Sequence, residues 1–147
     1  MEKWLLFGIL ASLCWGTYVV LQKVSVSGKY FGIVNSVFLL LMLAGIAVVF
    51  LGDVIASGQK LELPASPLAL LVAVGAGALW ALGIVFATLA LSGGADVAKL
   101  VPIYNTNTLV AVFLGIVLLG EVPSSANQIK VLIGAIMIIA GGILVSI

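Results

Sequence analysis

The feature that most constrains the fold is a series of five apolar runs, each long enough to cross a lipid bilayer. A transmembrane helix needs roughly 20 consecutive apolar residues. The chain is 64% hydrophobic and 7% charged, with a mean hydropathy of +1.41. These values exclude a soluble fold and predict an all-α integral membrane protein, a bundle of five transmembrane helices. The predicted spans are Trp4–Ser25, Tyr30–Gly52, Leu68–Leu91, Asp96–Leu119 and Gln128–Ile147.

The connections between the predicted helices are short, with one exception. Short connections place consecutive helices next to each other in antiparallel orientation. The longer connection, Asp53–Pro67, carries prolines and polar residues, as is typical of a loop outside the bilayer. The first span is too long for the apolar core of a signal peptide, so we expect it to be retained. The sequence therefore predicts a single transmembrane domain over residues 1–147.

The lysines are balanced between the two faces of the predicted bundle. All six basic residues are lysines, and five crossings divide them equally: one face carries Lys3, Lys60 and Lys130, and the other carries Lys23, Lys29 and Lys99. Orientation in a membrane is set mainly by the asymmetry of Lys and Arg in short loops. Because this chain has almost no asymmetry, we expect it to insert in both orientations.

The ionisable residues exclude several classes of function. The net charge is +1, which indicates no nucleic-acid partner. There is no histidine, and the five carboxylates all lie at span ends or in loops. We therefore expect no metal, no cofactor and no enzymatic activity. The absence of a carboxylate at mid-depth also argues against a pump or channel that depends on a buried acid.

Neutral polar residues gather instead in the middle of the fourth span. Residues 104–108 read Tyr-Asn-Thr-Asn-Thr and closely follow Pro102, which removes one backbone donor and frees a carbonyl one turn earlier. An unpaired amide in hydrocarbon costs about 4–8 kcal/mol by alkane transfer. These side chains must therefore face other helices or a wet cavity. Interhelical hydrogen bonding alone is one explanation; we favour cavity lining.

Two tryptophans lie at an unusual depth. Membrane tryptophans favour the interfaces, but Trp15 and Trp80 are at the middle of the first and third spans. Tyr18 shares a small, polar helix face with Trp15. Helix packing is the simpler explanation for both tryptophans. The candidate substrate-binding residues are Trp15, Tyr18, Trp80, Tyr104, Asn105, Asn107 and Thr108. For Lys23 we prefer an interfacial anchor, and Asn35 fits either packing or binding.

The residues resemble the EamA-type domains of the drug/metabolite transporter superfamily. The string Trp15-Gly16-Thr17-Tyr18 followed by Lys23 is similar to the first helix of that family. Pro102 in the fourth helix, the Leu118-Leu119-Gly120-Glu121 ending and the glycines of the last helix follow the same layout. The resemblance covers nearly the whole chain and implies a five-helix half-unit. Most relatives carry two inverted units in one chain, whereas this chain carries one. It also lacks the arginine that relatives often have near the second helix, where Lys29 is the nearest basic residue.

The resemblance and the lysine balance together predict an inverted, antiparallel homodimer resembling a ten-helix transporter. We expect a multi-pass protein of the plasma membrane, in contact with membrane lipid, that transports a small polar neutral or zwitterionic metabolite. Transport would proceed by alternating access around a midplane cavity. Two alternatives stay open: a non-transporting membrane subunit or assembly factor, and a passive channel. The first predicts no cavity, and the second predicts a polar stripe on several helices.

Overall fold

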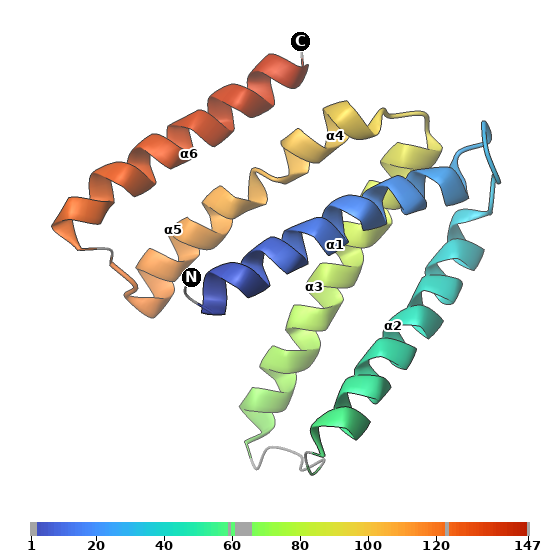
Figure 1. Ribbon diagram of the computed structural model, residues 1–147, viewed down its shortest axis with the longest axis horizontal. Helices are drawn as coiled ribbons and strands as arrows, with labels where there is room; N and C mark the ends of the chain where they lie inside the picture. The colour runs from blue at the N-terminus through green and yellow to red at the C-terminus, as the bar shows by residue number, and fades with distance from the viewer. Residues whose placement is uncertain (1–2, 59, 61–65, 123, 147) are drawn as a thin grey trace. The chain divides into compact units, whose positions relative to one another are not determined.

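The structure is a computed structural model that describes residues 3–58, 60, 66–122 and 124–146. Within these residues it is helical, with no strand. Five candidate membrane spans run over Leu6–Val26, Asn35–Ser57, Pro67–Ser92, Val97–Leu119 and Asn127–Val145. The prediction of an all-helical chain with five apolar spans is confirmed (Figure 1). The helices are α1 (Lys3–Val26), α2 (Asn35–Ser57), α3 (Pro67–Ser92), α4 (Val97–Tyr104), α5 (Asn107–Leu119) and α6 (Ser125–Ser146).

The chain forms two compact units, Met1–Gly94 and Ala95–Ile147. The first unit, which we call the N-terminal unit, contains α1, α2 and α3, and all three helices pack against one another. The second, the C-terminal unit, contains α4, α5 and α6, and its main packing contact is between α4 and α6.

Packing in the N-terminal unit is concentrated at one end, where the last turns of α1 and α3 meet (Figure 1). The buried positions on α1 recur at steps of three and four residues, which places them on one helix face. Further towards the N-terminus of α1 this packing stops, since Trp15 is 66% exposed. The buried residues of this end are Val19, Gln22, Val26, Ser27, Thr88 and Leu91.

The second span begins later than predicted. The sequence placed its start at Tyr30, but α2 begins at Asn35. The apolar residues in between form a connection whose backbone N–H groups bond carbonyls at the end of α1, for example Ile33 N to Ser25 O at 2.8 Å. Gly32 allows this reversal with a φ of +58°. The connection thus satisfies carbonyls that a helix end leaves unpaired.

The second span also ends later than predicted. Asp53 was expected to open the loop to Pro67, but it lies inside α2, which continues to Ser57 and ends at Gly58 with a φ of +61°. Gly58 provides the left-handed conformation that commonly stops a helix. α3 then begins at Pro67, which occupies the first turn of the helix, where proline is tolerated. Residues 59 and 61–65 of the predicted loop lie outside the described residues.

The fourth span is not one continuous helix. It was predicted as Asp96–Leu119, but α4 ends at Tyr104 and α5 begins at Asn107. Between them, backbone N–H groups bond carbonyls three residues earlier, as in a tighter helical turn: Thr106 N donates to Ile103 O at 3.2 Å and Leu109 N donates to Thr106 O at 2.9 Å. Pro102 lies inside α4, and proline weakens the bonding of the turn around it.

A close approach of α4 and α6 holds the C-terminal unit together. Gly142 is buried in α6. A Cβ atom at this position would lie 3.5 Å from Thr106 Cγ2 and 3.6 Å from Pro102 O. At Gly142, α6 therefore packs directly against the break in the fourth span, with room for a methyl group but not for a large side chain, as small residues allow between membrane helices.

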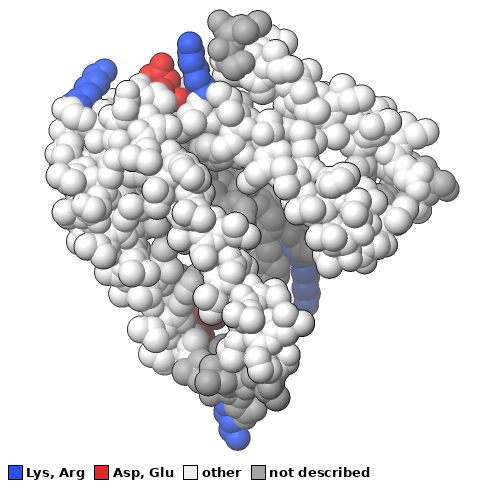
Figure 2. Space-filling view, turned by 180° about the vertical axis from the view of Figure 1, so that it is seen from behind, with Lys and Arg blue, Asp and Glu red and all other residues white. Residues whose placement is uncertain are grey.

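The surface is almost entirely uncharged. In the face seen in Figure 2, charged side chains are few, and most of the surface is white. Many large apolar side chains are exposed on every long helix, for example Phe50 at 67% and Leu79 at 72%. An exposed apolar surface of this extent fits contact with lipid or with another membrane protein chain.

Candidate functional site

The break between α4 and α5 places an amide and hydroxyl tract near the middle of the fourth span. The Thr106 hydroxyl donates to Ile103 O at 2.7 Å, and the Thr106 N–H bonds the same carbonyl. Ser, Thr and Asn side chains compete for backbone bonds in this way and so interrupt helices. The tract thus explains the break. In membrane transporters, substrate sites are typically formed by such discontinuous helices.

The side chains around the break differ in exposure. Thr106 and Tyr104 are half-buried, whereas Asn105, Asn107 and Thr108 are exposed on the chain. All of these side chains lie in the C-terminal unit. Exposed amides at this depth need water or a second polar surface, because hydrocarbon offers them no partner.

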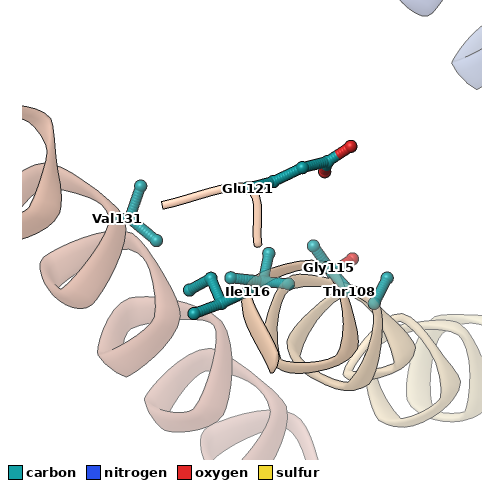
Figure 3. A pocket seen from close by; sticks show the side chains of 7 residues that line it. Thr108, Gly115, Ile116, Glu121 and Val131 are labelled. Atoms are coloured by element: carbon teal, nitrogen blue, oxygen red, sulfur yellow. The ribbon is translucent and has the colours of Figure 1, made fainter. Parts of the chain in front are cut away.

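An open pocket of about 370 Å³ follows one face of α5. Most of its lining recurs at steps of three and four residues along the helix, which marks a single face. Figure 3 shows Glu121 reaching from the connection after α5 across the end of that helix, towards the side on which Gly115 and Thr108 lie. We call this the α5 pocket; it is lined by Thr108, Ala111, Val112, Gly115, Ile116, Glu121 and Val131.

The position of Glu121 depends on two glycines. Gly120 ends α5 with a φ of +67°, and the N–H groups of Gly120 and Glu121 both bond Gly115 O. A Cβ atom at Gly115 would lie 3.3 Å from Glu121 Oε2, a tight contact. Gly115 therefore provides the space in which the carboxylate rests against the helix.

The aromatic candidates lie in the N-terminal unit. Trp15 on α1 and Trp80 on α3 are 66% and 51% exposed. The Tyr18 hydroxyl is buried, and its ring lines a second open pocket of about 430 Å³ along α1, together with Thr17 and Leu21. The N-terminal unit thus holds Trp15, Tyr18 and Trp80, and the C-terminal unit holds the other candidates. That these residues bind substrate stays a prediction.

Side-chain hydrogen bonds join the helices of the N-terminal unit at the C-terminal end of α3. Gln22 Nε2 donates to Thr88 Oγ1 at 2.8 Å. Lys23 Nζ donates to Leu91 O at 3.2 Å, and Asn35 Nδ2 donates to Ser92 Oγ at 2.9 Å. Lys23 therefore contacts the end of a neighbouring helix, and Asn35, which the sequence left open, takes part in packing.

The orientation of the Gln22 amide follows from the hydroxyl it contacts. The single proton of the Thr88 hydroxyl is donated to Ile84 O at 2.7 Å, so Thr88 can only accept from Gln22. Gln22 Nε2 must face Thr88, and Gln22 Oε1 points away. That oxygen is buried and has no hydrogen-bond donor among the described residues. Gln22 is 1% exposed and Thr88 is fully buried.

The sequence placed Gln22 on the polar face of the first span and Glu121 at the end of the fourth, but it predicted no contact for either of them or for Thr88. Gln22 and Thr88 could have been paired, because each lies near the C-terminal end of its span and the two spans run in the same direction. Gly120 signals the left-handed end of α5, but that signal does not give the direction in which the Glu121 side chain then points. In the described part of the chain, no group of three or more metal-ligating side chains comes together.

Comparison with known proteins agrees with this architecture. Neither the curated proteins nor the solved structures include a significant match to the chain. A family model does match, and it covers residues 2–147, which is nearly the whole sequence. Together with the five apolar helices, this match shows that the chain belongs to the EamA-like transporter family.

Proposed function

We propose that this protein is a secondary transporter of a small polar, neutral or zwitterionic metabolite and has no enzymatic activity. The main support for the proposal is the break at Asn105–Thr106, where amides and hydroxyls lie close to the middle of an apolar span. Helix packing needs few such groups, because interhelical hydrogen bonds between membrane helices contribute only about 0.6 kcal/mol each on average. A substrate with polar groups would provide partners for the exposed Asn105 and Asn107 side chains.

The working unit of the proposal is an antiparallel homodimer in the plasma membrane. Asn105 and Asn107 are exposed on a single chain, and a second chain would enclose them in a shared cavity. A unit of five spans places its two termini on opposite faces, so only an inverted partner reproduces the ten-helix arrangement of two-unit relatives. The equal division of the six lysines would permit both orientations. In this arrangement Trp15, Tyr18, Trp80 and Tyr104 would contact the apolar body of the substrate.

The distribution of hydrogen bonds supports alternating access. The bonds between α1, α2 and α3 lie at one end of the N-terminal unit, where the buried residues also gather. The opposite halves of these helices are largely exposed. A rocking motion would suit an end joined by side-chain hydrogen bonds and an opposite end with largely exposed side chains, since the joined end would act as the pivot.

The proposal is tested in two steps on purified protein. A thermal-stability screen with amino acids, sugars and nucleosides identifies ligands, because a bound ligand raises the apparent stability by mass action. Counterflow of the radiolabelled hit into proteoliposomes then measures transport. Asn107→Leu should abolish transport and leave expression intact. Asn127→Leu is the matched control, because this amide only accepts a bond from Lys130 at the start of α6, and it should leave transport unchanged. Equal transport by both variants would contradict the proposal.

A further inference from the structure

The α5 pocket combines an apolar wall with one carboxylate. Its lining is aliphatic or glycine apart from the Thr108 hydroxyl and the Glu121 carboxylate. The carboxylate rests against Gly115, and the pocket extends from there along the helix towards Thr108 (Figure 3). A ligand that fits such a surface has an apolar body and one group that complements a negative charge.

The local electrostatics favour a cation beside Glu121. The carboxylate follows the C-terminal end of α5, where the backbone dipole is already negative. No lysine lines the pocket in the described part of the chain. Lys130, which precedes the pocket residue Val131, donates instead to Asn127 Oδ1 at 3.3 Å. A carboxylate and a helix C-terminus together form a site that attracts a positive charge and repels an anion.

We propose that the α5 pocket binds the ammonium group of the transported substrate, with Glu121 as its counter-ion. The inference rests on the proposed function and deepens it, because it narrows the substrate class to zwitterions that carry an ammonium group. Thr108 is shared between this pocket and the predicted substrate-binding residues. Glu121 lies just beyond the end of the fourth span at Leu119, so the pocket would receive the substrate at the membrane interface. The residues that line the pocket continue from there along α5 towards the break between α4 and α5.

The test measures binding of benzylammonium to the purified full-length protein in nanodiscs by isothermal titration calorimetry. Benzyl alcohol and phenylacetate are the uncharged and anionic analogues. Wild type should bind the ammonium and neither analogue. Glu121→Gln should weaken binding roughly tenfold or more, the range expected when a charged hydrogen-bond partner is lost. Gly115→Leu should weaken it similarly, because its side chain would fill the space beside the carboxylate.

The matched control is Asp53→Asn. Asp53 is an exposed carboxylate in α2, and by the count of spans it lies towards the same membrane face as Glu121. Asp53→Asn removes one negative charge from that face, as Glu121→Gln does. The control should nevertheless bind benzylammonium like wild type. Equal binding by wild type and Glu121→Gln, equal binding of benzyl alcohol, or no binding by wild type would overturn the inference.

A lipid headgroup is the other source of an ammonium group at this depth. The measurement is therefore made in nanodiscs of phosphatidylglycerol and repeated with phosphatidylethanolamine added. Unchanged affinity supports a soluble substrate, whereas loss of binding assigns the site to lipid and overturns the substrate assignment. Because the assay needs no transport, its failure is separate from failure of the proposed function. Counterflow that persists without ammonium binding would refute only the pocket assignment.

Discussion

Thr88→Val provides the sharpest test of the packing between α1 and α3. Valine keeps the shape of threonine and removes only the hydroxyl. In the variant, Gln22 Nε2 loses its acceptor, and the Gln22 amide, which is 1% exposed, is left with neither of its polar atoms paired to the described residues. Leaving a buried donor unpaired costs about 1–3 kcal/mol. We expect the free energy of unfolding to fall by this amount.

The reciprocal variant should behave differently. Gln22→Met removes the amide, including the oxygen that has no donor, and the Thr88 hydroxyl keeps its bond to Ile84 O. We therefore expect a loss of only about 0.6 kcal/mol, the mean for an interhelical bond in a membrane. In the double variant Thr88→Val/Gln22→Met, the cost of Thr88→Val should largely disappear.

The assay is reversible unfolding in mixed micelles, followed by circular dichroism. Thr17→Val is the matched control, because Thr17 is an exposed threonine on α1, and it should change stability by less than about 0.5 kcal/mol. If Thr88→Val is no more destabilising than Thr17→Val, the Gln22–Thr88 bond does not contribute to the folded protein, and the pivot assigned to this end loses its support.

Two further predictions concern the packing of Gly142 and the pH dependence of transport. Gly142→Leu should destabilise the C-terminal unit by about 1–3 kcal/mol in the same unfolding assay, because leucine would overpack the contact with Thr106 and Pro102. Gly142→Ala is the control and should be tolerated, since its Cβ atom would make only ordinary contacts at 3.5 Å. Equal destabilisation by the two variants would contradict the close packing of α6 at this position. Counterflow should vary little between mildly acidic and mildly basic pH, because no carboxylate lies in the middle of a span. A steep pH dependence that Asp96→Asn removes would show that an acid at a span end couples transport.

The sequence was sufficient for the number and type of the spans and insufficient for their ends. Apolar runs report which residues avoid water, so five helices could be predicted. They do not report where an apolar segment leaves the helix, which is why Tyr30 was assigned to a span although it lies in a connection bonded to the end of α1. Gly32, which adopts a positive φ in the structure, was a signal in the sequence that the connection continues past Tyr30.

The break in the fourth span was visible in part. The sequence showed Pro102 and the polar tract after it, and both were interpreted as features of a continuous helix. Whether a Thr hydroxyl bonds a carbonyl of its own helix or of a neighbouring helix depends on local geometry. Here the Thr106 hydroxyl bonds Ile103 O, at the point where the backbone bonds carbonyls three residues earlier. The order of the spans indicates that Gln22 and Thr88 lie at a similar depth, but the hydrogen bond between them is seen only in the packed structure.

The central claim, inverted pairing of two chains, is tested most directly by the orientation of the connection before α3. Cys14, the one native cysteine, is replaced by alanine, and Ser66, which is exposed and makes no capping hydrogen bond, is changed to cysteine. Labelling of intact cells with a membrane-impermeant maleimide, before and after permeabilisation, measures the fraction of Ser66→Cys on each side. Inverted pairing of two chains predicts that Ser66→Cys is labelled from both sides in comparable amounts. Labelling from one side alone would contradict it.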